Sequence, residues 1–226
     1  MATATWNVAA TNSFTGAPLI FQTTYEQRYL RAAIKGICDR LRKRTLGVEF
    51  GAGYGRMTLV LEEFFGRAVG FEREQALVTA ASSVPSRIEI FNVPTLSAVP
   101  LSDGQADFAF CCTVLQHMMD ESTRDTLAEM RRVVGSGFIL LIETSHPGFL
   151  DGKYGEGIFT KGRSVGEYEI MLAPWCSDFV RPRHIGSTSG EVWGSLMMFR
   201  SPDMMRGEMS DDANWTSDEL SRSYVR

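Results

Sequence analysis

Three closely spaced glycines early in the chain could bind a ligand through the backbone. Gly51, Gly53 and Gly55 alternate with other residues, and they separate the short apolar run 47–50 from a stretch with helical periodicity. A glycine-rich turn between a strand and its helix lets a ligand approach the main chain closely, beside the amide groups of a helix N-terminus. The spacing therefore predicts a strand, a ligand-binding turn and a helix.

Two charged residues beside this turn narrow the class of ligand. Arg56 stands where the dinucleotide fingerprint Gly-x-Gly-x-x-Gly requires its third glycine. Glu49 lies inside the strand, where its carboxylate would repel a pyrophosphate and would suit a ligand with positive charge. Both residues argue against a nicotinamide-dependent oxidoreductase, which stays the first alternative.

Polar side chains that could move a proton follow two later apolar runs, 107–111 and 138–143. The carboxyl ends of parallel strands form the ligand site in sheets of this kind, and a general base assists transfer to a hydroxyl or a protonated amine. The polar residues at these ends are Gln116, His117, Glu143, Thr144, Ser145 and His146. We expect the catalytic group to be His117, His146 or Glu143.

Metal and disulfide chemistry is not indicated. The three histidines and the acidic residues show no metal-ligand spacing, and the four cysteines form no CxxC pair. Free thiols favour a reducing compartment, so we expect a cytoplasmic protein. The adjacent Cys111 and Cys112 should point to opposite faces of a strand.

The elements that must position these residues alternate along the chain. Apolar runs that read as strands are separated by helical patterns, which predicts an α/β fold with a doubly wound, mostly parallel sheet covered on both faces. The predicted strands are 47–50, 68–71, 88–91, 107–111, 138–143, 179–185 and 192–199, and the predicted helices are 25–41, 57–65, 74–82, 122–134 and 167–172.

Five segments, in the order of the chain, resemble the motifs of the class I S-adenosylmethionine-dependent methyltransferases. They are 48–56, 69–72, 91–93, 99–108 and 112–117. The resemblance covers residues 45–145, and more loosely 25–200. Two departures concern the third segment: Asn92 stands where the family more commonly has Asp, and the loop after it is a few residues longer.

The resemblance implies S-adenosyl-L-methionine as the cofactor and a seven-strand sheet whose last two strands form an antiparallel edge hairpin. It implies that Glu72, seventeen residues after Gly55, binds the ribose hydroxyls. Glu49 has two open roles, support of the turn or contact with the methionine amino group. The expected cofactor residues are Glu49, Gly51, Ala52, Gly53, Gly55, Glu72, Arg73, Asn92, Val93, Cys112, Thr113, Tyr25 and Arg28.

Residues 146–178 are the expected cover of the methyl acceptor. Aromatic and basic residues are mixed in this glycine-rich stretch, which suits a ring or sugar with an anionic group, although an ordinary solvated loop is an equal alternative. The expected acceptor residues are Gln116, His117, His146, Tyr154 and Arg163. Lys153, Lys161, Arg163, Arg181 and Arg183 would supply positive charge.

The whole chain fits one methyltransferase domain acting on a small molecule. Its 226 residues carry a net charge of −4, which makes nucleic acid an unlikely partner, and it has no apolar run that could span a membrane. We expect an N-terminal cap segment at 1–24, the domain at 25–206 and a polar tail at 207–226. A catalytically silent, methyltransferase-like binding protein is the second alternative, and the sequence leaves the oligomeric state open.

Overall fold

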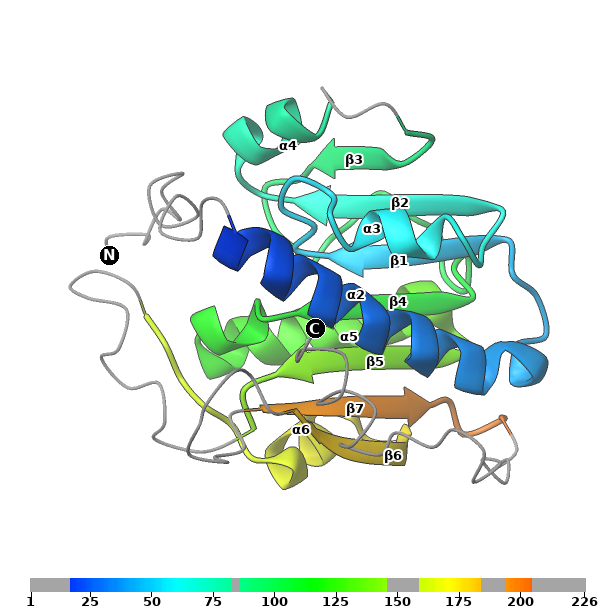
Figure 1. Ribbon diagram of the computed structural model, residues 1–226. Coiled ribbons are helices and arrows are strands. Elements are labelled where there is room, and N and C mark those ends of the chain that lie inside the picture. The colour runs from blue at the N-terminus through cyan, green and yellow to red at the C-terminus, as the bar shows by residue number, and fades with distance from the viewer. Residues whose placement is uncertain (1–16, 83–85, 146–158, 184–193, 205–226) are drawn as a thin grey trace, which may run out of the picture.

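The computed structural model describes residues 17–82, 86–145, 159–183 and 194–204, and it shows one sheet with helices on both faces (Figure 1). The strands are β1 (Leu46–Phe50), β2 (Arg67–Glu72), β3 (Glu89–Asn92), β4 (Phe108–Cys112), β5 (Phe138–Glu143), β6 (Cys176–Arg183) and β7 (Gly194–Arg200). The α-helices are α2 (Ala17–Ile37), α3 (Thr58–Leu61), α4 (Gln75–Ala81), α5 (Asp120–Val134) and α6 (Val165–Leu172), and the 3₁₀ helices are η1 (Cys38–Arg40) and η2 (Leu115–His117).

The strand order confirms the predicted sheet. The strands lie in the order β3-β2-β1-β4-β5-β7-β6, with β1 to β5 mutually parallel. Strand β7 is antiparallel to both β5 and β6, so the last two strands form the expected antiparallel hairpin at one edge. From β1 the chain adds β2 and β3 on one side and then β4 and β5 on the other, so the order in which strands are added reverses between β1 and β4. Ligands bind at the carboxyl ends of the strands beside such a reversal.

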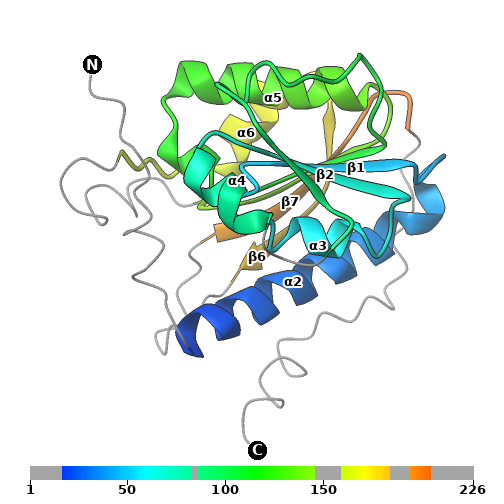
Figure 2. The same cartoon turned by 90° about the horizontal axis from the view of Figure 1, so that it is seen from above.

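Helices lie on both faces of the sheet (Figure 2), and alternation along the central strands divides the core into two layers. In β4, Phe108, Phe110 and Cys112 pack with α2 and α3, whereas Ala109 and Cys111 pack with α5 and α6. This two-residue period places the neighbouring cysteines on opposite faces, as predicted. All four cysteines carry free thiols.

The element boundaries depart from the predicted ones at several points. The first helix starts at Ala17, not Tyr25, and so includes part of the expected cap segment. Its first turn contains Pro18, which costs no hydrogen bond there, but residues 17–24 have no apolar period that would have revealed the helix. Among the described residues, no helix has both the length and the apolar character needed to cross a membrane.

Candidate functional site

The glycine turn leaves room for a ligand above its middle residue. Gly51, Gly53 and Gly55 have φ angles of +78°, +57° and +86°, which favour glycine. A Cβ on Gly51 would lie 2.4 Å from a methyl group of Val114, so this glycine is required by packing. A Cβ on Gly53 would meet no described atom within 4 Å. Gly53 therefore faces open space, as a backbone cradle for a ligand requires.

Glu72, the last residue of β2, borders the same space. One of its carboxylate oxygens accepts a hydrogen bond from the Gly53 amide at 2.8 Å, and the other accepts from the amides of Arg73 at 2.7 Å and Glu74 at 2.9 Å. The carboxylate is thus held against the glycine turn by three backbone donors. A carboxylate fixed in this way can also accept from ribose hydroxyls, which is the role that the resemblance implies.

Asn92 and Val93 tie the end of β3 to the end of β2. The Asn92 amide nitrogen donates to the carbonyls of Glu72 at 3.1 Å and Arg73 at 2.8 Å, and the Val93 amide donates to the Glu72 carbonyl at 2.9 Å. An aspartate could not make the two side-chain donations, which gives a physical reason for the asparagine. Asn92 is exposed and Val93 is buried.

Glu49 supports the turn from below. Its side chain is buried in β1 and accepts a hydrogen bond from the Thr58 hydroxyl at 2.5 Å. Burial raises the pKa of Glu49 to about 8. The Thr58 contact corresponds to the first of the two roles left open by the sequence, the support of the turn.

A buried ion pair joins α2 to the turn, and sequence analysis did not identify it. The guanidinium of Arg56 pairs with the fully buried carboxylate of Glu26, and the Gln27 amide donates to the Arg56 carbonyl at 2.7 Å. Arg56 stands where the dinucleotide fingerprint has its third glycine, and it also attaches the first helix to the ligand-binding turn. Glu26 lies on a helical stretch with no motif around it, so no local signal marked it.

The loop after β4 has a strained start. Thr113 has a φ of +55°, which is an outlier for a β-branched residue. Its amide donates to the Ile142 carbonyl at 2.8 Å and its hydroxyl donates to the Cys112 carbonyl at 2.8 Å. Strain of this kind is retained where the surrounding structure fixes the backbone for function. The loop begins at the sheet reversal, beside the glycine turn, as Gly51 and Val114 show.

Glu143 serves this loop, which corrects its expected role as a proton acceptor. The carboxylate is fully buried and accepts from the backbone amides of Val114 at 2.9 Å, Leu115 at 3.0 Å and Gln116 at 3.2 Å. Burial raises the pKa of Glu143, while the three amides lower it. Since its oxygens already bind the loop, we assign Glu143 to loop support.

Gln116 and His117 form one hydrogen-bonded chain. The Thr144 hydroxyl donates to the Gln116 carbonyl oxygen at 2.7 Å, the Gln116 amide nitrogen lies 3.1 Å from Nε2 of His117, and Nδ1 of His117 lies 3.1 Å from the Phe159 carbonyl. A carbonyl only accepts, so Nδ1 carries the proton and Nε2 accepts from Gln116. Burial lowers the pKa of His117, which favours this neutral form.

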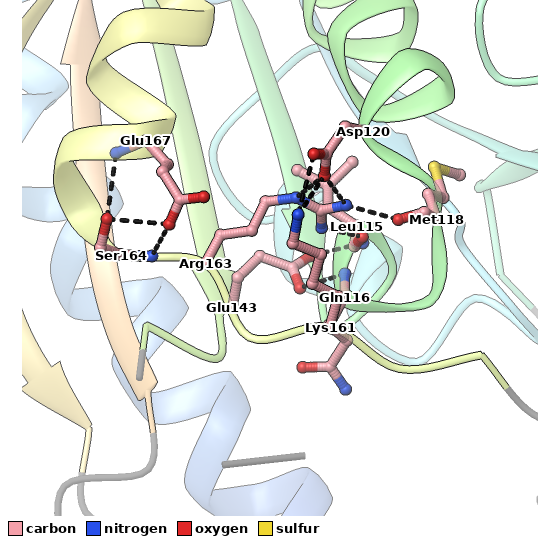
Figure 3. Close-up of polar contacts among 9 residues, drawn as sticks. All are labelled: Leu115, Gln116, Met118, Asp120, Glu143, Lys161, Arg163, Ser164 and Glu167. Carbon is pink, nitrogen blue, oxygen red and sulfur yellow. Dashed lines mark hydrogen bonds and ion pairs between the residues drawn. The ribbon is translucent and has the colours of Figure 1, made fainter. Parts of the chain in front are cut away.

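Arg163 is not available to an acceptor, which corrects a second expectation. Its side chain is fully buried, and it donates to the carbonyls of Leu115 and Met118 and to the carboxylate of Asp120 (Figure 3). Lys161 also pairs with Asp120, at 2.8 Å. Two of the five cations expected to attract an anionic acceptor are therefore already paired with one aspartate.

The structure describes only some of the remaining candidate residues. Ala52 and Cys112 are buried in the turn and in β4, Arg73 is partly exposed, and Arg28 is exposed on α2. His146 and Tyr154 lie outside the described residues, as do Lys153 and the third histidine, His184, and the side chain of Tyr25 is not described. No group of three potential metal ligands occurs in the described part of the chain.

A family comparison agrees with the geometry. Residues 48–142, which run from β1 to β5, match the family described as methyltransferase domain. No curated protein sequence matches the chain.

Solved structures show the same fold. A S-adenosylmethionine-dependent methyltransferase of Methanosarcina mazei superimposes with a TM-score of 0.60 and 16% identity over 73% of this chain and 96% of its own. A proposed methyltransferase of Bacillus halodurans gives a TM-score of 0.62 and 15% identity over 76% and 98%. A proposed sarcosine dimethylglycine methyltransferase of Galdieria sulphuraria gives a TM-score of 0.62 and 14% identity over 78% and 85%.

Proposed function

We propose that this chain, a class I S-adenosylmethionine-dependent methyltransferase, transfers the cofactor's methyl group to an oxygen or nitrogen atom of a small molecule. The observation that carries the proposal is the open cradle at Gly53 with the Glu72 carboxylate fixed at its side. Both lie at the carboxyl ends of β1 and β2, beside the reversal of the sheet, where this fold binds ligands.

The residues around the cradle fit the parts of the cofactor. Glu72 would bind the ribose, the backbone of Gly51–Gly55 would contact the cofactor directly, and the end of β3 with Asn92 and Val93 would lie at the adenine. Cys112, the last residue of β4, and Thr113, which follows it, would lie at the methionine end. When bound, the sulfonium group supplies an activated methyl group.

This chain's own contribution is then to position an acceptor and exclude water. Fixing two reactants in line can supply on the order of 7–11 kcal/mol of the barrier. His117 can take a proton at Nε2 only by releasing the Gln116 amide. His146, three residues after the end of β5, is the other proposed base, and it lies outside the described residues.

The acceptor itself is proposed only as a small molecule. Lys161 and Arg163 are bound to Asp120, so an anionic group would rely on Arg181, which is exposed, and on residues outside the described part. Neutral and anionic acceptors should therefore be assayed side by side, at two ionic strengths. We also propose a cytoplasmic location, in agreement with the four free thiols.

Calorimetry with S-adenosylmethionine, S-adenosylhomocysteine and NAD tests the proposal. We expect binding of the first two and none of NAD, because Arg56 stands where the dinucleotide fingerprint requires its third glycine. Binding of NAD without binding of either S-adenosyl compound would favour the oxidoreductase alternative. Transfer of a labelled methyl group to any member of a small-molecule panel distinguishes an enzyme from a silent binding protein.

A further inference from the structure

The loop between β4 and α5 is held by opposite charges on its two sides. Residues 113–119 contain the short helix η2, whose first amides have no partners within the helix and whose Leu115 carbonyl accepts from the Met118 amide at 3.0 Å. On the amide side, the Glu143 carboxylate accepts from residues 114–116. On the carbonyl side, the Arg163 guanidinium donates to Leu115 at 2.7 Å and to Met118 at 2.5 Å.

Both the side chain and the backbone of Arg163 are fixed. Its Nε and one terminal nitrogen donate to the same oxygen of Asp120, at 3.0 and 2.9 Å, and Asp120 is the first residue of α5. The next residue, Ser164, begins α6 with a reciprocal capping box, in which Ser164 and Glu167 each accept the other's backbone amide. All three nitrogens of a fully buried guanidinium are therefore used, and its backbone is anchored to a helix (Figure 3).

The same segment joins the acceptor cover to the loop. The Phe159 carbonyl accepts from His117, the Lys161 amide donates to the Gln116 carbonyl at 2.8 Å, and Arg163 binds the carbonyls described above. Residues 159–163 thus lie along residues 115–118 in an extended arrangement. Residues 159–163 belong to the expected acceptor cover, residues 146–178. The position of this part of the cover therefore depends on the loop.

We propose that Arg163 is a positioning residue for methyl transfer: it fixes residues 113–118 against the cofactor and joins the acceptor cover to that loop. This inference rests on the proposed function, because it assigns Arg163 to the same site. Because its side chain is fully buried and its nitrogens bond Leu115, Met118 and Asp120, we assign Arg163 no direct contact with cofactor or acceptor. It acts through Thr113, at the methionine end, and through Gln116 and His117, on the acceptor side.

The guanidinium geometry explains why arginine and not lysine occupies this position. Two loop carbonyls and one carboxylate oxygen surround the group, and a planar fork of five donors can reach all three at once, whereas a single ammonium group cannot keep the same geometry. Lys161, from the same segment, pairs with Asp120 through a partly exposed ammonium group that bonds none of these carbonyls. It provides a matched control.

Amide exchange in the ligand-free protein tests the clamp directly. In Arg163→Met, the amides of Val114, Leu115 and Gln116 should exchange about tenfold faster or more, because the loop loses one of its two anchors. The amides of Phe50 and Phe110 in β1 and β4 should be unchanged, and Lys161→Met should leave the loop amides as they are. Unchanged loop exchange in Arg163→Met, or an equal effect of Lys161→Met, would overturn the inference.

Two further measurements report on the loop's chemistry. The half-buried ring of His117 should titrate at a higher pKa in Arg163→Met, seen by NMR, because a looser loop exposes it further to water. Affinity for S-adenosylhomocysteine should fall about tenfold, the cost of lost charged hydrogen bonds that hold the binding residues. Arg163→Lys should restore neither the pKa of His117 nor the affinity for S-adenosylhomocysteine. Lys161→Met should leave the pKa of His117 in place and should change the affinity by no more than about twofold.

Asp120→Asn keeps the inference testable if Arg163→Met does not fold. This change leaves the buried arginine in place and removes the charge that orients it, from a side chain that is one-third exposed. We expect the same direction of change in loop exchange and in ligand affinity, and no change in either would overturn the proposal. A native protein that binds no S-adenosylhomocysteine would contradict the proposed function, while the exchange comparison would still decide whether Arg163 holds the loop.

Discussion

Single residues at the carboxyl ends of β1 and β2 carry the proposed cofactor site. Glu72 is the best defined of them, since three backbone amides fix its carboxylate beside the glycine turn. Gly53 offers the space, and Glu49 supports the turn while buried beneath it. Each of these residues makes a different physical contribution, so each can be tested separately.

Glu72→Ala should weaken binding of S-adenosylmethionine by about 1–3 kcal/mol, because buried ribose hydroxyls would lose their acceptor. Calorimetry measures this change. Glu74→Ala, next to the same backbone turn but without a bond to Gly53, serves as the control and should bind normally. Equal affinity of Glu72→Ala and the native protein would sink the ribose assignment.

Gly53→Val should fold and fail to bind the cofactor. The structure leaves space for the side chain, so the folded state pays only for the left-handed backbone, about 1–2 kcal/mol. Gly104 is a matched control, since its φ is +64° and a Cβ there also meets nothing within 4 Å. Gly104→Val should show similar thermal destabilisation with normal binding. Near-normal binding by Gly53→Val would mean that the ligand lies elsewhere.

Glu49 should give the stability of the protein a characteristic pH dependence. Its pKa is about 8 in the folded protein and 4.5 in an ordinary environment. Between these values the unfolded chain is ionised and the folded chain holds the proton, so the free energy of unfolding falls as the pH rises through this window. Glu49→Gln should remove this fall.

The difference between the two proteins, measured by urea unfolding from pH 4.5 to 8, isolates Glu49. His117 contributes with the opposite sign near its own pKa, but it does so in both proteins and cancels. Parallel curves for native protein and Glu49→Gln would contradict a buried, protonated Glu49.

At the scale of elements, α2 and the glycine turn behave as one unit. The helix packs its apolar face against α3 and the sheet, and Leu30, Ile34 and Ile37 are fully buried. The Glu26–Arg56 pair then joins the helix to the turn itself. Loss of the Glu26–Arg56 pair should therefore lower the stability of the fold and also change the geometry of the ligand site.

Arg56→Met should lower the free energy of unfolding by about 3 kcal/mol, because it removes one side of a buried ion pair with Glu26. Adding Glu26→Gln should restore part of the loss, since no buried charge then remains. Unfolding by urea measures both variants. If the double variant is no more stable than Arg56→Met, the ion pair is not the cause of the loss.

At the scale of the whole molecule, a second network of charged side chains lies at the end of the sheet opposite the proposed site. The proposed site uses the carboxyl ends of the parallel strands. At their amino ends, Asp178 of β6 accepts from Arg40 at 2.6 and 2.8 Å and pairs with Arg200 of β7 at 3.5 Å. The Arg40 guanidinium also lies over the ring of Phe138, at the start of β5. This network joins the edge hairpin to the helical layer.

Asp178→Ala should cost about 3–5 kcal/mol of folding stability, because two largely buried guanidinium groups lose their shared carboxylate. Cofactor affinity of the folded protein should not change, since the site lies at the other end of the sheet. Glu63→Ala is the control: its pair with Arg31 is exposed and should be worth at most about 1 kcal/mol. A large loss of affinity in Asp178→Ala would show that the two ends are coupled.

The sequence by itself determined the fold class and the position of the glycine turn, and its resemblance to the class I methyltransferases implied the cofactor. These depend on local patterns: alternating apolar runs, glycines that need positive φ, and an acid at the end of the second strand. Each pattern can be read within a few residues, because backbone sterics and strand periodicity act at that range. The opposite-facing cysteines were predicted for the same reason, whereas the edge hairpin was implied by the resemblance to the methyltransferase family.

Only the tertiary structure decided how individual polar side chains are used. Glu143 and Arg163 have the residue types of a catalytic base and of an anion-binding cation, yet backbone groups 27 to 48 positions away use them to hold a loop. Lys161 pairs with Asp120, 41 positions away. Glu26 gave no sequence signal, because its partner Arg56 is thirty residues away. Burial and long-range partners set the protonation and availability of a side chain, and neither is encoded in the residues next to it.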